Sequence, residues 1–141
     1  MESSKYDIEA LIPHRKPFLF IDRLEHVDDD EIVGYKRFLE TEYFFDGHFP
    51  DYPVVPGVIL VECMAQCGGA GLAATGRFDS SLTFLAAIER AKFRKQVGPG
   101  DTIKIVVTNR RVSDKMIRQS GKAFADGDIA AEADWLCIRG A

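Results

Sequence analysis

Apolar residues follow two different spacings along the chain, and these spacings predict the order of its helices and strands. Residues 57–76, GVILVECMAQCGGAGLAATG, do not alternate and are too long for one strand, so we expect a helix there. Residues 18–27 and 31–39 are rich in β-forming side chains and are separated by three aspartates, which is typical of a hairpin. A short helix is predicted over residues 6–12, ending at Pro13.

Beyond Gly76 the pattern predicts four more strands, at residues 82–97, 101–112, 115–125 and 128–138. The sequences GPGD and ADGD supply turns between them. In the last run, alternate apolar residues are expected to face the core. These are Ala131, Ala133, Trp135 and Cys137. The predicted fold is α+β, with one helix laid on a curved antiparallel sheet in a single domain over residues 1–141.

The predicted long helix is apolar on nearly all sides, although one sheet can cover only one side of a helix. A second sheet from a partner subunit, or a strongly wrapped sheet, would cover the rest. The sequence therefore leaves open whether the helix is buried within one subunit or between two.

Composition narrows the class of protein. The 141 residues are 46% hydrophobic and 28% charged, which fits a globular domain with its own core. The net charge of −4 disfavours general binding to nucleic acid. With no secretory signal and no uninterrupted apolar span of 18 residues, we expect a cytoplasmic protein without a membrane span.

Glu62 is the one charged residue of the predicted long helix. The residues that share its helix face are Val58, Ala65, Gln66 and Gly69. No basic residue occurs between His48 and Arg77, so burial would favour a neutral carboxyl that can donate a proton. The alternatives are that Glu62 reaches solvent at a subunit rim or pairs with a distant arginine.

The same helix is unusually rich in glycine and cysteine. Gly68, Gly69 and Gly71 each cost about 1 kcal/mol relative to alanine, which indicates that another segment or a ligand approaches the backbone closely. Cys63 and Cys67 lie four residues apart, but two thiols do not make a metal site, and the sequence offers no His or Asp beside them. We expect no metal and reduced, mostly buried thiols.

His48 lies in a segment rich in glycine and proline, followed by Phe49 and Pro50. Prolines restrict the backbone, and a rigidly held imidazole suits a general base. The alternative is a histidine that only hydrogen-bonds a turn. We assign that structural role to His14 and His26, which have no comparable setting.

The start of the predicted long helix lies between these two groups. Its free N–H groups at Gly57 and Val58 favour negative charge. A base at His48, an acid at Glu62 and an anion site between them form a set able to eliminate water next to a carbonyl. No phosphate-binding loop, dinucleotide fingerprint or nucleophile elbow is present, so no cofactor is expected.

Residues 47–66, GHFPDYPVVPGVILVECMAQ, resemble the signature of FabZ-type 3-hydroxyacyl-(acyl carrier protein) dehydratases. The flanking segments LIPHRKPFLFIDR (11–23) and AKFRKQVGPGD (91–101) resemble two further family segments. Asp51 and Val55 differ from the glycine and methionine that are common in the family, which leaves the acyl chain-length preference open.

The resemblance implies a hot-dog fold, with a central helix wrapped by the sheet, and a homodimer with one continuous sheet. Each active site would take His48 as base from one chain and Glu62 as acid from the other. The residues implied to contact substrate are Gly57, Val58, Gln66 and Phe49. The reaction would convert (3R)-hydroxyacyl to trans-2-enoyl thioesters in fatty acid synthesis. Assembly of three dimers into a hexamer is also implied.

Cations in the segment 90–95 form a candidate surface for acyl carrier protein, which is acidic and carries a phosphopantetheine arm. A strand would place Arg90, Lys92 and Arg94 on one face, with Lys95 beside them. The alternative is an ordinary solvated strand face.

Two other functions fit the same predicted scaffold. One is a thioesterase, and the other is a non-catalytic module that binds acyl carrier protein or lipid. The acid–base pair argues against the second, since binding alone needs neither group.

Overall fold

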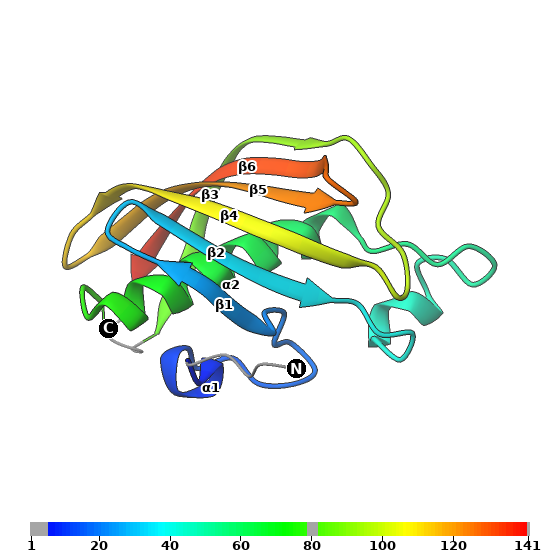
Figure 1. The fold of residues 1–141 in the computed structure, drawn as a ribbon, viewed down its shortest axis with the longest axis horizontal. Coiled ribbons are helices and arrows are strands. Elements are labelled where there is room, and N and C mark those ends of the chain that lie inside the picture. Colours follow the sequence, from blue (N-terminus) through cyan, green and yellow to red (C-terminus); the bar gives the residue numbers. More distant parts are fainter. Residues whose placement is uncertain (1–5, 79–81, 141) are drawn as a thin grey trace.

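A computed structural model describes residues 6–78 and 82–140, in which one antiparallel sheet curves around one long helix (Figure 1). The helices are α1 (Ile8–Leu11), a 3-10 turn (Tyr43–Asp46) and α2 (Gly57–Thr75). The strands are β1 (Arg23–Val27), β2 (Glu31–Arg37), β3 (Thr83–Phe93), β4 (Thr102–Val112), β5 (Met116–Ala125) and β6 (Asp128–Arg139). This arrangement confirms the predicted α+β class.

The strand order is β1-β2-β4-β5-β6-β3, and every neighbouring pair is antiparallel. Strand β3 follows α2 in sequence and joins the edge opposite β1, pairing with β6 alone. Helix α2 thus crosses beneath the sheet and connects β2, the neighbour of edge strand β1, with β3 at the opposite edge. One consequence is that, within residues 6–78 and 82–140, one side of the β3 backbone has no neighbouring strand.

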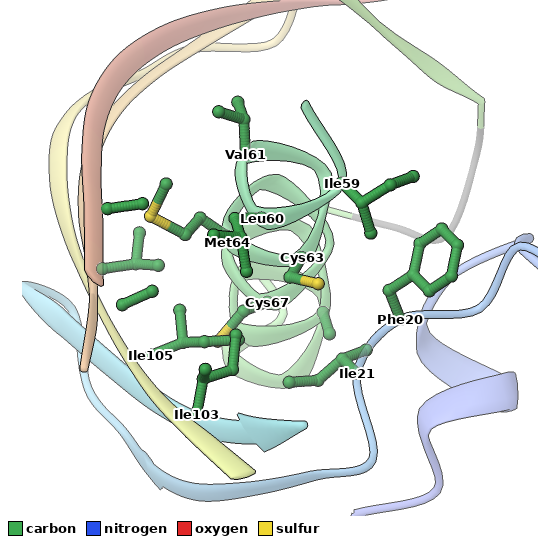
Figure 2. Packing of buried hydrophobic residues seen from close by; sticks show 14 of the residues in the cluster. Phe20, Ile21, Ile59, Leu60, Val61, Cys63, Met64, Cys67, Ile103 and Ile105 are labelled. Atoms are coloured by element: carbon green, nitrogen blue, oxygen red, sulfur yellow. The ribbon is translucent and has the colours of Figure 1, made fainter. Parts of the chain in front are cut away.

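The core lies between α2 and the concave face of the sheet. Ile103, Ile105 and Val107 alternate along β4 and are fully buried. Figure 2 looks along α2 and shows Cys67 pointing toward Ile103 and Ile105. Cys63 and Cys67 are buried free thiols, as expected, and burial raises the pKa of both.

Two of the helix glycines are explained by close packing against the chain's own sheet. A Cβ at Gly68 would overlap the amide of Gln119 on β5, and one at Gly71 would lie 2.5 Å from Ile32 on β2. The predicted close approach is therefore confirmed at these two positions. Gly69 differs, because a Cβ there would meet only Ile12, at 3.9 Å.

Helix α2 is long and apolar enough, by length and composition alone, to cross a membrane. However, 61% of its most apolar window is buried within the fold, which identifies it as the core helix of this domain. As the sequence indicated, no 18-residue stretch of α2 is free of charge, because Glu62 lies within it.

Candidate active site

Glu62 opens onto a cavity of about 180 Å³ beside α2. From the helix, the cavity is lined by Glu62, Ala65, Gln66 and Gly69, which are the residues predicted to share a face, apart from Val58. Val58 is outside the lining and is 71% exposed at the start of the helix. The Glu62 side chain is only 20% exposed, so the carboxyl faces a partly enclosed space rather than open solvent.

Gln66 holds the Glu62 carboxyl in place. Its Nε2 donates to Glu62 Oε2 at 3.0 Å and to the carbonyl of Phe18, also at 3.0 Å. Its Oε1 accepts the N–H of Phe20 at 2.7 Å. Because a carbonyl can only accept and an N–H can only donate, these bonds determine which way the amide points. Among the described residues Glu62 Oε1 has no hydrogen-bond partner, whereas Oε2 accepts from Gln66.

These bonds also explain a wrong strand prediction. Residues 18–22 were expected to belong to the first strand, but β1 begins at Arg23. The backbone groups of Phe18 and Phe20 bond the Gln66 side chain instead of a neighbouring strand. The segment 18–20 therefore supports the carboxyl site rather than extending the sheet.

His14 was assigned a structural role in a turn, and this prediction was wrong. It lines the Glu62 cavity, with Nε2 3.6 Å from Glu62 Oε2. Its Nδ1 is buried without a hydrogen-bond partner among the described residues. Arg15 donates to the carbonyls of Ile12 and His14, which holds the loop that carries the ring. The sequence offers Glu62 no basic partner between His48 and Arg77, and its basic neighbour His14 comes from a distant segment.

The environment of His14 makes stability depend on pH. Burial lowers the pKa of His14, and nearby Arg15 adds to this, while the Glu62 carboxylate opposes it. The unfolded chain therefore binds this proton more readily, so the stability of the folded protein falls as pH drops below the ordinary histidine value, about 6.5.

We expect His14→Gln to lose less stability than the wild type on acidification. The difference in slope cannot exceed about 1.4 kcal/mol per pH unit, which is one proton. Urea denaturation at pH 7.5 and 5.5 measures it. Equal acid sensitivity in both proteins would show that His14 does not cause the pH dependence in this range.

His48 lies in the loop before α2 and is half-buried. Its Nδ1 is 2.9 Å from the carbonyl of Val54, and a carbonyl can only accept, so Nδ1 carries a proton. In the neutral ring the lone pair is then on Nε2. The Phe49 ring stacks on the imidazole with centroids 4.3 Å apart, and the N–H of Val54 donates to the carbonyl of His48. The loop thus holds an imidazole in the tautomer that a base at Nε2 requires.

The first turn of α2 presents backbone donors near this loop. The N–H groups of Ile59 and Leu60 donate to the carbonyl of Pro56, whereas those of Gly57 and Val58 have no backbone acceptor within the described residues. A Cβ at Gly57 would lie 2.9 Å from the Phe93 ring, so this position has no room for a side chain without a shift of that ring. The two amides remain available to an anionic or carbonyl oxygen.

One subunit does not bring all the predicted residues to one place. The lining of the Glu62 cavity includes Gln66 but not His48, Phe49 or Gly57. The sequence also did not single out two other lining residues, His14 and Gln119. The alternation of β5, in which Ile117 and Gln119 face the same way, could have indicated the second of these.

The predicted row of cations, which consists of Arg90, Lys92, Arg94 and Lys95, does not lie on a regular strand. Strand β3 ends at Phe93, and Arg90 has a positive φ of 50° where the pairing with β6 shifts register. This bulge, rather than simple alternation, sets the directions of the side chains. Arg90 pairs with Asp134 and Arg94 with Glu132, each at 2.7 Å.

The two lysines of this row, Lys92 and Lys95, differ in their surroundings. Lys95 lies 3.3 Å from Asp128, whereas Lys92 has no ion pair among the described residues. Three of the four cations are therefore already balanced by acidic side chains of the same chain, which reduces the positive charge available to a partner.

The described residues contain no group of three or more His, Cys, Asp or Glu placed to hold a metal ion. Cys137 lines the cavity, and burial, with a smaller effect of Glu62, raises its pKa to about 11. Its thiol is therefore protonated near neutral pH and is a poor nucleophile.

A helix wrapped by a curved antiparallel sheet, with a carboxyl held in a partly enclosed cavity beside the helix, defines a hot-dog fold with a candidate acid site. Solved structures share this fold. The dehydratase heterocomplex ApeI:P from Xenorhabdus doucetiae matches with a TM-score of 0.82 and 16% identity, covering 95% of this chain and 91% of that chain. A hypothetical thioesterase with coenzyme A from Streptococcus pneumoniae matches with a TM-score of 0.62 and 12% identity, covering 84% of each chain.

Sequence comparisons are more specific than the fold. Residues 12–134 match the family model of the FabA-like domain. The 3-hydroxyacyl-[acyl-carrier-protein] dehydratase FabZ of Clostridium botulinum is 40% identical over 137 residues, covering 95% of this chain and 94% of that protein. The corresponding protein of Clostridium kluyveri is 38% identical, covering 99% of this chain and 98% of that protein. The chain therefore belongs to the FabZ-type 3-hydroxyacyl-[acyl-carrier-protein] dehydratases, within the FabA-like family.

Proposed function

We propose that this protein eliminates water from (3R)-hydroxyacyl groups on acyl carrier protein to give trans-2-enoyl thioesters in fatty acid synthesis. The observation that carries the proposal is Glu62, held by Gln66 through Oε2 in a cavity, with no partner for Oε1 in the part of the chain that the structure describes. The names of the relatives support the same reaction. We place the reaction in the cytoplasm and assign it no cofactor.

The proposed chemistry divides between two ends of the site. His48 Nε2 takes the proton from the carbon next to the thioester carbonyl. The N–H of Gly57, aided by Val58, holds the oxygen on which negative charge develops. Glu62 gives its proton from Oε1 to the departing hydroxyl, which leaves as water. Phe49 stacks on the base and limits its motion.

We propose that each site combines His48 of one subunit with the partner subunit's Glu62. The unpaired edge of β3 supports this, because large apolar side chains are exposed along it. These are Phe84, Leu85, Ile88 and Phe93, between 37% and 58% exposed. A long apolar edge strand invites pairing with another chain. Pairing of two β3 edges would form one continuous sheet over two helices, and three such dimers could then assemble into a hexamer.

This dimer can be tested at the edge strand. Ile88→Lys places a charge among the exposed apolar residues of β3 and is expected to weaken dimerisation at least about a hundredfold, since an unpaired buried charge costs about 3 kcal/mol or more. Light scattering across a dilution series measures the monomer fraction, and activity should fall with it. Glu25→Lys, at an exposed position of β1 on the other edge of the sheet, is the matched control. A dimer unchanged by Ile88→Lys would place the interface elsewhere.

Acyl carrier protein is the proposed macromolecular partner. Of the proposed contacts Arg90, Lys92, Arg94 and Lys95, Lys92 has no intramolecular ion pair among the described residues, so its charge is the most available to an acidic partner. Contact through the other three would require exchange of their present pairs, which makes them the weaker contributors.

A direct assay separates this function from thioester hydrolysis, the alternative activity that the same scaffold could carry. Purified protein given 3-hydroxyacyl-acyl carrier protein should produce the ultraviolet absorbance of an enoyl thioester without releasing free thiol. A thiol reagent follows the second product in the same sample. Thiol release without enoyl formation would identify a thioesterase, and binding without either product would identify a non-catalytic module.

A further inference from the structure

Lys36 carries a buried charge that the proposed chemistry does not use. Among the described residues it is the only charged one that is buried, at 5% exposed. It lies on β2, where the alternation of the strand places it on the same face of the sheet as the fully buried Ile32. Its cross-strand neighbour on β4 is Ile103, which is also fully buried. A strand position that faces the core ordinarily carries an apolar side chain, so this ammonium group calls for a physical account.

Glu42 is the ion-pair partner of this ammonium group. Lys36 Nζ donates to Glu42 Oε2 at 2.8 Å, and the Glu42 side chain is 12% exposed. The same Oε2 accepts the N–H of Leu39 at 3.2 Å. Asp22 contributes a second, more distant carboxylate, with Oδ1 3.8 Å from Nζ. The buried charge is therefore balanced mainly by a carboxylate that is itself hydrogen-bonded to the backbone.

The ion pair lies at the start of the segment that leads to His48. The N–H of Glu42 donates to the carbonyl of Leu39 at 3.1 Å, and its carbonyl accepts from Phe45 at 3.2 Å in the 3-10 turn. The N–H of His48 then donates to the carbonyl of Phe44 at 3.0 Å. A series of short-range backbone hydrogen bonds therefore connects the ion pair with the proposed base.

The loop that carries His48 is also held at its other end. There the N–H of Val55 donates to the carbonyl of Val97 at 2.7 Å. Between these two ends, the imidazole and the backbone carbonyl of His48 both bond Val54, which belongs to the same loop. Those bonds fix the ring relative to the loop and leave the position of the loop relative to the sheet to the contacts at its ends.

Apolar burial and the ion pair hold the turn in different ways. Phe44 and Phe45 are buried and attach the turn to the core, but the hydrophobic effect has no preferred direction. A charged hydrogen bond fixes a distance and an angle. A buried ion pair adds little stability over apolar side chains of similar volume, because removing two charges from water offsets most of their attraction. What the Lys36–Glu42 ion pair adds is therefore one defined geometry.

We propose that Lys36 and Glu42 are positioning residues, whose ion pair sets the place of the His48 loop relative to the sheet. This inference rests on the proposed dehydratase function and names what holds its base; neither residue is assigned contact with substrate. In a site shared between subunits, His48 must meet the partner subunit's Glu62. Bonds within one loop cannot set that distance, so the base depends on how its loop is held against its own sheet. A displacement of about 1 Å can lower the rate about a hundredfold.

The first test removes the ion pair without leaving an unpaired charge. Lys36→Met together with Glu42→Gln keeps the size of both side chains, so the double variant should remain folded, and we expect kcat to fall at least about tenfold. Enoyl-thioester absorbance under saturating substrate measures kcat, and circular dichroism gives the folded fraction. Glu42→Asp keeps the charge but withdraws the carboxylate by one methylene, so it should also lower kcat at least about tenfold, and it decides the matter where the double variant fails to fold. Either variant, folded and with kcat within about twofold of the wild type, would overturn the inference.

Val107→Ala is the control for a general loss of stability. It removes buried volume from β4, four residues beyond the cross-strand neighbour of Lys36 and outside the lining of the Glu62 cavity. Its kcat per folded enzyme should stay within about twofold of the wild type. An equal fall of kcat per folded enzyme in Val107→Ala and in the double variant would overturn the inference.

A second test asks whether the ion pair acts through the base. Groups that act as a unit are not additive, so the double variant should lower kcat at least about tenfold in a Glu62→Gln background but less than about twofold in a His48→Ala background. Equal losses in both backgrounds would indicate a purely structural role, and a loss only in the His48→Ala background would place the effect at the acid. Either result would overturn the inference. Absence of turnover by the wild type would instead contradict the proposed function.

Discussion

Replacing Glu62 with glutamine is expected to lower kcat at least about a hundredfold, the loss typical of a proton-transferring group. Glutamine has nearly the same shape, and Gln66 can still donate to its amide oxygen, so the fold and the cavity should persist. What is lost is the proton that the departing hydroxyl requires. Enoyl-thioester absorbance under saturating substrate measures kcat directly, and the melting temperature reports whether the variant remains folded.

Glu132→Gln is the matched control for this experiment. Glu132 is a carboxylate on β6 that is outside the cavity lining and pairs with Arg94, so its loss should leave kcat near the wild-type value. If Glu62→Gln keeps kcat within tenfold of the wild type, the proton comes from another group and the assignment of Glu62 is wrong. His14 would then be the first residue to test, because its Nε2 lies 3.6 Å from the same carboxyl.

The elements that the sequence predicted well are those in which local pattern and tertiary burial agree. Strands β4, β5 and β6 alternate apolar and polar residues, and in β6 the predicted inward residues Ala131, Ala133 and Trp135 are buried. Helix α2 lies within one residue of its predicted bounds, since Gly76 adopts the left-handed conformation that ends a helix. Helical geometry alone predicted which residues share a helix face with Glu62.

The parts that the sequence did not predict depend on contacts between distant segments. His14 reaches Glu62 across 48 residues, and nothing within either local segment indicates that they meet. The amide of Gln119 bonds Gly68 across 51 residues, so the glycine was expected to meet some segment without that segment being identified. The spacing of residues in the sequence predicts which side chains are neighbours within one helix or strand. The contacts of His14 and Gln119 depend instead on how α2 packs against the sheet and the first loop.

Gln66 shows why packing and chemistry are inseparable in this fold. One amide joins the segment 18–20 to α2 and also orients the carboxyl of Glu62. The bonds that engage the backbone of residues 18–20 in place of a strand partner therefore also position the proposed acid. A strand prediction from sequence uses only the apolar side chains of Phe18 and Phe20. It contains no information on the hydrogen bonds between their backbone groups and Gln66.

Mixing two inactive variants is expected to restore activity if each site is shared between subunits. His48→Ala and Glu62→Gln homodimers each lack one group in both sites. A mixed dimer has one site lacking both groups and one site that is intact. Random exchange of equal amounts makes half of the dimers mixed, so recovery should approach about a quarter of the wild-type activity. Against parents that retain about 1% or less, this is a rise of at least about twentyfold.

The control for this experiment must show that the two variants have exchanged subunits. Subunits carrying different affinity tags allow the mixed dimer to be purified by two successive columns, and its activity is then measured without the two parents. Single-subunit sites would leave that purified dimer as inactive as its parents, because neither chain holds both groups. The separation of His48 from the lining of the Glu62 cavity within one chain favours the shared arrangement. Recovery in the purified mixed dimer would therefore support the assignment of both groups and their positions on opposite subunits.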